Sequence, residues 1–163
     1  SILGARTAPR VGLAWSGNPI HKNDSNRSIA LARLRPLLAV PGLRFISLQK
    51  DLREEDAGVL RGLPALVQIG AQLDDFADTA AAVSLLDLVI TVDSAVAHLA
   101  GALGKPVWVL LPYAPDWRWL LERENSPWYP SARLFRQSAR GKWDEAVSEV
   151  AITMQQLIQG TTD

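Results

Sequence analysis

The sequence predicts a doubly wound α/β domain with a parallel sheet covered by helices on both faces. The chain has 163 residues, which is the size of one domain. Short apolar runs alternate with helical segments of about 10 to 15 residues. The clearest runs, 88–92 and 107–111, are apolar at successive positions, with Thr91 the one exception, rather than at every second position. Such runs are typical of parallel strands that are buried on both sides.

The first half of the chain alternates between strands and helices. An apolar run at 10–15 ends in the turn-forming sequence at 16–19. The leucines of 29–40 have helical spacing, and Pro41 and Gly42 end this helical pattern. Pro36 is expected to shorten the start of the helix. We expect strands at 10–15, 43–48 and 66–69 and helices at 29–40 and 54–62.

The second half repeats the alternation. Asp74 or Asp75 is expected to cap a helix in which Phe76, Ala80, Val83 and Leu86, or their neighbours, face one side. Ser94 is expected to open a helix that Gly104 and Pro106 stop. We expect strands at 88–92, 107–111 and, from a weaker pattern, 133–136, and helices from 94 to about 103 and from 143 to 158.

Composition excludes several classes of function. Lys plus Arg and Asp plus Glu both number 17, so the chain lacks the positive excess that holds nucleic acid polymers. The absence of cysteine excludes disulfides, thiolate metal ligands and a cysteine nucleophile, and two histidines do not complete a zinc site, so we expect no metal. No uncharged run is long enough to span a bilayer and no apolar signal region is present, which predicts a soluble, cytoplasmic protein.

The strongest local feature is the passage from the strand at 88–92 into the next helix, with only Asp93 and Ser94 between. Unpaired N–H groups at a helix start, together with the helix dipole, bind anions. His98 lies one turn after Ser94 and leans toward the same point, so a diphosphate fits there. The alternatives are a plain N-cap for Ser94, a carboxylate that accepts nearby N–H groups for Asp93, and a buried core position for His98.

Two further segments reach the same edge of the predicted sheet. The loop after the first strand contains Ser16, Gly17 and Asn18, where small Gly17 permits close ligand approach, and Arg27, the second phosphate candidate. His21 and Lys22 in this loop are read as solvent-exposed. Gln49 and Lys50 follow the second strand and suit a base, ribose or phosphate oxygen, or else are solvated.

A Pro-rich segment at 112–130 holds many of the aromatic residues. It is expected to close the pocket or meet a partner domain, or alternatively to cap the domain's own core. The aromatic residues of this segment are Tyr113, Trp117, Trp119, Trp128 and Tyr129.

Two common nucleotide-binding motifs are absent from the sequence. Gly104-Lys105-Pro106 is not a phosphate loop, and no Gly-x-Gly-x-x-Gly follows the first strand, so nucleoside-triphosphate and dinucleotide sites are not expected.

From Val11 to about Trp143, the chain resembles the C-terminal, donor-binding half of GT-B glycosyltransferases of the ADP-heptose heptosyltransferase-like superfamily. The likeness is closest to the version that follows tetratricopeptide repeats in bacterial proteins. The matching stretches are Trp15-Ser16-Gly17-Asn18-Pro19, Arg27-Ser28-Ile29, Ser47-Leu48-Gln49-Lys50, Asp78-Thr79-Ala80-Ala81, Asp93-Ser94-Ala95-Val96-Ala97-His98, Pro115-Asp116-Trp117-Arg118-Trp119 and Ser126-Pro127-Trp128-Tyr129-Pro130.

The resemblance implies a GT-B fold, in which two Rossmann-like domains face each other, and sugar transfer with inversion from a nucleotide-activated donor. It implies a donor diphosphate site at Asp93, Ser94, Ala95 and His98, where Ala95 replaces the family's glycine, with Arg27 as a basic contact. Gln49 and Lys50 are similar to a nucleotide-contacting stretch of protein O-GlcNAc transferases.

The resemblance also implies partners outside this chain. The acceptor site and the usual base belong to an N-terminal domain, so we expect a natural protein that extends N-terminally, possesses tetratricopeptide repeats and has a UDP-, ADP- or GDP-linked sugar as its substrate, with no separate cofactor. The isolated chain should bind donor without turnover. The alternatives are a non-catalytic module that contacts proteins through 112–130, and an unrelated sugar-phosphate or nucleotide-binding domain such as an epimerase.

Overall fold

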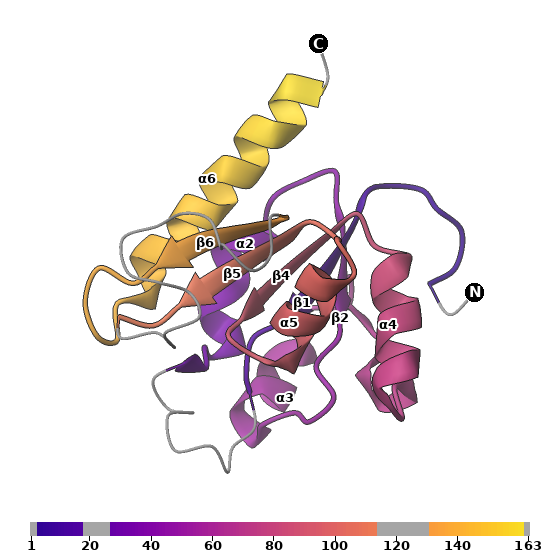
Figure 1. The fold of residues 1–163 in the computed structure, drawn as a ribbon. Helices are drawn as coiled ribbons and strands as arrows, with labels where there is room; N and C mark the ends of the chain where they lie inside the picture. Colours follow the sequence, from indigo (N-terminus) through magenta and orange to yellow (C-terminus); the bar gives the residue numbers. More distant parts are fainter. Residues whose placement is uncertain (1–2, 18–26, 114–130, 162–163) are drawn as a thin grey trace.

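The computed structural model describes residues 3–17, 27–113 and 131–161, which form a six-stranded parallel sheet with the strand order β3-β2-β1-β4-β5-β6 (Figure 1). The predicted doubly wound α/β class is confirmed. The strands are β1 (Arg10–Ala14), β2 (Arg44–Ser47), β3 (Val67–Gln68), β4 (Leu88–Val92), β5 (Val107–Leu111) and β6 (Ala132–Arg136). The helices are η1 (Leu31–Leu34), α2 (Arg35–Leu38), α3 (Glu54–Leu60), η2 (Gly70–Gln72), α4 (Phe76–Ser84), α5 (Ala95–Ala102) and α6 (Trp143–Thr161), of which η1 and η2 are 3₁₀ turns.

Two hydrophobic layers bury the two faces of the sheet. One layer joins β1, β4 and β5 to η1, α2, α3 and α6, with Leu13, Ile90 and Val150 among its buried side chains. The other joins the opposite face to α4 and α5, with Val83 and Ala100 buried. Because β4 and β5 are covered on both sides, every residue in them is buried, which explains their continuous apolar sequence.

The segment predicted as one helix at 29–40 is a 3₁₀ turn followed by a short α-helix. Pro36 lies in the first turn of α2 and has no N–H to donate, so the chain starts a new helix there instead of continuing η1. The prediction of a single helix was therefore wrong. Leu31, Leu34 and Leu37 are nevertheless buried, as their spacing requires.

The start of α4 departs from the prediction in one respect. Asp75, not Asp74, caps the helix, since its Oδ1 accepts a hydrogen bond from the N–H of Asp78 at 2.8 Å. Phe76, which the spacing places on the same side as Val83, is 70% exposed, whereas Val83 is buried. The first turn of α4 lies outside the core, and its core contact begins further along with Ala82 and Val83.

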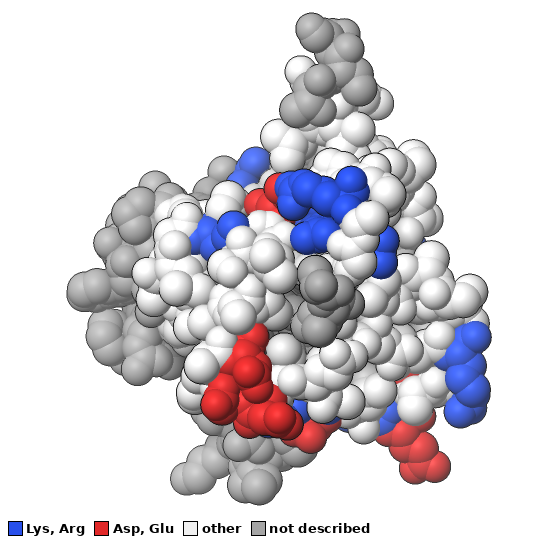
Figure 2. Space-filling model, turned by 90° about the vertical axis from the view of Figure 1, so that its right-hand side faces the viewer, with Lys and Arg blue, Asp and Glu red and all other residues white. Residues whose placement is uncertain are grey.

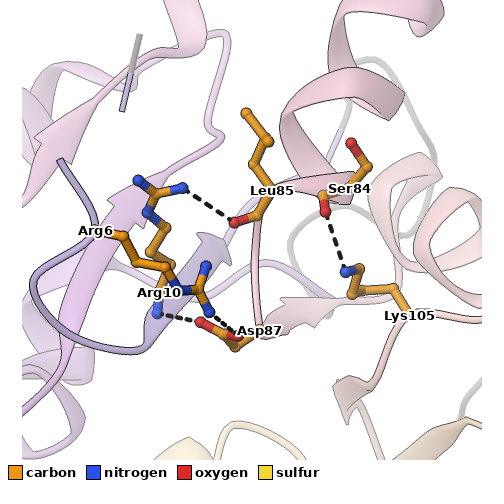
Figure 3. Close-up of polar contacts among 6 residues, drawn as sticks. All are labelled: Arg6, Arg10, Ser84, Leu85, Asp87 and Lys105. Carbon is orange, nitrogen blue, oxygen red and sulfur yellow. Dashed lines mark hydrogen bonds and ion pairs between the residues drawn. The ribbon is translucent and has the colours of Figure 1, made fainter. Parts of the chain in front are cut away.

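The amino edge of the sheet is held by Asp87 (Figure 3). Its carboxylate accepts the N–H of Arg10 at 2.8 Å and pairs with the guanidinium of Arg6, so it links the start of β1 to the start of β4. The buried Arg10 side chain donates to the carbonyls of Leu85 and Gly4. Polar groups at this edge therefore bond to one another across the strands.

The face seen in Figure 2 has basic and acidic side chains in separate patches. This face therefore does not present a continuous basic surface. Among the described residues, we find no helix with the length and apolar character needed to cross a membrane.

Candidate functional site

A pocket of about 460 Å³ lies at the carboxyl edge of the sheet. The loops after β1, β2 and β4 form it, and these three strands are adjacent in the order β2-β1-β4. The chain leaves β1 toward β2 on one side and reaches β4 on the other, which makes this the switch point where α/β sheets bind ligands. The lining residues are Ala14, Ser16, Gly17, Arg27, Leu48, Gln49, Lys50, Asp51, Ser94, Ala95 and Val96.

Arg27 lies over the pocket because two features hold its guanidinium. Its Nη1 donates to the carbonyl oxygen of Asp93 at 3.2 Å. Its plane packs against Gly17, where a Cβ would lie only 2.7 Å from Nη2. Gly17 therefore makes room for Arg27, and it also lines the pocket. The Nε–H of Arg27 is buried and has no acceptor among the described residues.

Ser94 and the start of α5 form the opposite wall. Ser94 occupies the N-cap position with extended backbone, but its side chain makes no capping hydrogen bond. Its Oγ lies 3.1 Å from the Oγ1 of Thr91. The alternative of a plain N-cap for Ser94 is thus wrong as regards its hydroxyl. The N–H of Ala97 donates to the carbonyl of Ser94 at 3.0 Å, which leaves the N–H groups of Ala95 and Val96, at the very start of α5, without an acceptor inside the helix.

Asp93 and His98 contact each other beside the pocket. His98 Nε2 lies 3.4 Å from Asp93 Oδ1, and the side chains are 29% and 13% exposed, respectively. The lining of the pocket, as far as the structure describes it, includes Ser94 and Ala95 but neither Asp93 nor His98. His98 is only half-buried, so the alternative of a buried core histidine is wrong. It supports Asp93, whose carbonyl oxygen in turn holds Arg27.

Gln49 differs from the prediction that its amide is offered to a ligand or to solvent. Its Oε1 accepts the N–H groups of Trp15 and Ser16 at 3.0 and 3.2 Å. Its Nε2 donates to the carbonyls of Ser16 and Asp51 at 3.1 and 3.3 Å. These four bonds use the full capacity of a primary amide, so Gln49 shapes the wall of the pocket by fixing the backbone after β1.

Lys50 is exposed at the rim of the pocket and donates to the carbonyl of Asp74 at 3.2 Å. Asp51, next to it, also lines the pocket and was not predicted. Its place next to Lys50, in the segment that follows the second strand, was the one signal in the sequence. Lys50 and Asp51 together provide one cation and one carboxylate at the same rim.

Asp56 is a second residue that sequence reasoning missed. It lies in the first turn of α3, is 1% exposed, and accepts hydrogen bonds from the indole Nε1 of Trp15 and the N–H of Leu31, both at 2.9 Å. An acidic residue in the first turn of a helix is usually solvated and favoured there by the dipole. The sequence therefore contained no signal for its burial.

Some predicted residues lie outside the described part of the chain. These are Asn18, His21 and Lys22 of the loop after β1, and most of the aromatic segment, including Trp117, Trp119, Trp128 and Tyr129. Within residues 3–17, 27–113 and 131–161, no group of three or more potential metal ligands lies together.

In parallel α/β sheets, ligands bind beyond the carboxyl ends of the strands at such a switch point. Sequence comparison assigns the class of this domain. Residues 45–147 match the sequence model of glycosyltransferase family 9 (heptosyltransferase). The chain belongs to this family, and the resemblance to heptosyltransferase-like GT-B enzymes is confirmed at that level.

A curated relative covers nearly the whole chain. Protein FlbA of Caulobacter vibrioides is 35% identical over 153 residues, which is 90% of this chain and 25% of FlbA. The chain therefore spans a quarter of the length of that relative. The link to tetratricopeptide repeats stays a prediction.

Proposed function

We propose that this chain binds the nucleotide-sugar donor of an inverting glycosyltransferase, with the donor diphosphate between Arg27 and the start of α5. The observation that carries the proposal is the orientation of Arg27. Its guanidinium lines a pocket at the switch point of the sheet, and its buried Nε–H has no acceptor among the described residues. Arginine binds phosphate oxygens through charge-assisted hydrogen bonds, which would satisfy that donor.

The wall opposite Arg27 suits the same ligand. The N–H groups and dipole of α5 favour an anion beside Ser94 and Ala95. Ala95 is the exposed first residue of α5, so its methyl group occupies space that glycine would leave open. Asp93 and His98 would act indirectly. The carbonyl oxygen of Asp93 accepts a hydrogen bond from Arg27, and the carboxylate of Asp93 contacts His98.

The nucleoside would extend from the diphosphate toward Lys50 and Asp51. Leu48 and Val96 give this pocket apolar surface, and the two charged side chains at its rim suit ribose hydroxyls and phosphate oxygens. Gln49 contributes by holding Ser16 in place. We leave the base open among UDP, ADP and GDP, and propose that the donor binds without a separate cofactor or metal.

The chain would supply one half of the chemistry. In an inverting transfer, an acceptor hydroxyl attacks the anomeric carbon as the bond to the diphosphate breaks, and a base takes the proton of the hydroxyl. Arg27 and α5 would stabilise the charge that develops on the leaving diphosphate. We propose that the base and the acceptor site belong to an N-terminal domain of a longer protein, along with tetratricopeptide repeats.

The direct test is calorimetric titration of the chain with UDP, ADP and GDP, and with the matching nucleosides. At least one diphosphate should bind, and its nucleoside should bind more weakly. Ligand at about 100 times its dissociation constant should also raise the unfolding free energy by ~2.7 kcal/mol. If no nucleoside diphosphate binds at millimolar concentration, the proposal is wrong.

Two substitutions locate the site. Arg27→Ala should weaken diphosphate binding by about tenfold or more, since a charged hydrogen bond is worth about 1.5–3 kcal/mol. Arg33→Ala is the matched control, because Arg33 is an exposed surface arginine whose partner is Asp144. It should bind like wild type. His98→Ala should weaken diphosphate binding less than Arg27→Ala does, since His98 acts through Asp93.

A further inference from the structure

The buried carboxylate of Asp56 has no part in the proposed donor contacts. It lies in α3, on the face of the sheet covered by η1 and α2, and is not among the residues that line the pocket. Each carboxylate oxygen accepts one N–H group: Oδ2 that of the Trp15 indole and Oδ1 that of the Leu31 backbone, both at 2.9 Å. A charge buried this deeply is stable only when hydrogen bonds compensate for lost water.

The two donors stand on either side of the loop that reaches the pocket. Trp15 follows β1 directly, and Leu31 begins η1, so residues 16–30 run between them. The two ends of this loop are also joined to each other. The N–H of Ile29 donates to the carbonyl of Trp15 at 2.7 Å, and the N–H of Gly17 donates to Ser28 Oγ at 3.0 Å. Asp56 thus accepts hydrogen bonds from residues on both sides of the segment 16–30, next to the bonds that join the two ends of that segment.

Arg27 lies in this loop, next to Ser28 and four residues before Leu31. Its guanidinium is packed against Gly17 with a separation that leaves no room for a methyl group. The place of Arg27 over the pocket therefore depends on how the two ends of the loop sit against each other. We therefore expect a shift at either Trp15 or Leu31 to displace Gly17 and Arg27.

We propose that Asp56 is a positioning residue for the diphosphate site: it holds both ends of the loop 16–30 and so places Arg27 over the pocket. This inference rests on the proposed function, in which Arg27 contacts the donor diphosphate. Aspartate suits the role because both of its oxygens accept, and both facing groups are N–H donors.

Asp56→Asn is the informative substitution, because it keeps the shape and replaces one acceptor oxygen with an NH₂ group that faces an N–H donor. The affinity for the nucleoside diphosphate that binds wild type should fall about tenfold, the effect of one lost hydrogen bond to a charged group. The affinity for the matching nucleoside, which does not use Arg27, should stay unchanged. In the Arg27→Ala background, Asp56→Asn should have no further effect on diphosphate affinity.

Asp87→Asn is the matched control. Asp87 is also a carboxylate that accepts a backbone N–H and a side-chain donor, but at the amino edge of the sheet, away from the pocket. It should destabilise the chain and leave diphosphate affinity unchanged. The diphosphate affinities of both variants are compared at a temperature at which circular dichroism shows that each variant is folded.

Amide hydrogen exchange gives a readout that needs no ligand. Asp56→Asn should speed exchange at Gly17 and Ile29, the two N–H groups that close the loop, more than at Asp87, whose N–H bonds to the carbonyl of Arg10. Asp87→Asn should do the reverse.

The outcomes separate the two proposals. If wild type binds no nucleoside diphosphate, the proposed function fails, and with it the role of Asp56 toward a diphosphate. If wild type binds and Asp56→Asn binds equally well, or loses diphosphate and nucleoside affinity to the same extent, the positioning role is overturned while the proposed function stands. Unchanged exchange at Gly17 and Ile29 also overturns the positioning role.

Discussion

The indole N–H of Trp15 donates to the carboxylate of Asp56 at 2.9 Å, and both side chains are 1% exposed. This bond joins the residue after β1 to the first turn of α3, across 41 positions of sequence. It links the hydrophobic layer beneath the sheet to the loop that forms one wall of the pocket. Stability and ligand binding are therefore expected to depend on the same contact.

Trp15→Phe tests the energetic part of this contact. Phenylalanine keeps an aromatic ring in the core but removes the N–H, so one oxygen of Asp56 becomes a buried acceptor without a donor. The free energy of unfolding should fall by about 1–3 kcal/mol. Urea denaturation measures this. In an Asp56→Asn background the same substitution should cost less, and equal costs in both backgrounds would contradict the coupling.

Gly70→Ala should damage the fold at the rim of the pocket. A Cβ on Gly70 would lie 2.0 Å from the carbonyl oxygen of Gln49 and 2.6 Å from its carbon, both rigid backbone atoms. We expect a loss of about 3 kcal/mol or more in the free energy of unfolding. Gly58→Ala is the matched control. Gly58 is exposed inside α3, where a Cβ meets only ordinary contacts, so alanine should stabilise the chain by about 0.5–1 kcal/mol.

Asp87 should make part of the free energy of unfolding depend on pH in the acid range. Burial raises the pKa of its carboxyl, but the hydrogen bonds from Arg10 and Arg6 and the charges of Arg6 and Lys105 outweigh this and lower the pKa below its ordinary value of 3.8. A carboxyl whose pKa is lower in the folded than in the unfolded chain stabilises the fold above the unfolded pKa. That contribution is lost as the pH falls from about 3.8 through the folded pKa.

The pH dependence of unfolding by urea checks this prediction. Wild type should lose the contribution of Asp87 to stability as the pH falls below 3.8. Asp87→Asn should be less stable than wild type at neutral pH, and the difference should shrink across the acid range. Curves that remain parallel down to the lowest pH would show that Asp87 does not contribute in this way.

Gln49→Glu should impair the pocket without unfolding the sheet. The new carboxylate still accepts the N–H groups of Trp15 and Ser16, but it faces the carbonyls of Ser16 and Asp51 without the donor that Gln49 Nε2 supplies. It also places a negative charge beside the proposed diphosphate. Nucleoside diphosphate affinity should fall by about tenfold or more.

Gln68→Glu controls for the added charge. Gln68 is exposed on the edge strand β3, and it is not among the residues that line the pocket. Titration calorimetry should give wild-type affinity for this variant. Equal losses in Gln49→Glu and Gln68→Glu would attribute the effect to net charge rather than to the amide of Gln49.

The sequence predicted most of the sheet because burial leaves a continuous apolar pattern. The strands at 88–92 and 107–111 match β4 and β5 residue for residue, since both are central and covered on both faces. Pro36 divided the helix predicted at 29–40, and Phe76 lies on a helix turn that begins outside the core.

The order of strands and loops along the sequence was sufficient to predict which segments reach the carboxyl edge, because the ends of parallel strands meet there. Ser16, Arg27, Gln49 and Ser94 were assigned to one rim on that basis, and they line one pocket. Tertiary structure alone decided what their polar groups bond to. Gln49 and Asp56 meet Trp15 from 34 and 41 residues away, and a hydrogen bond between such distant residues leaves no periodic pattern in the sequence.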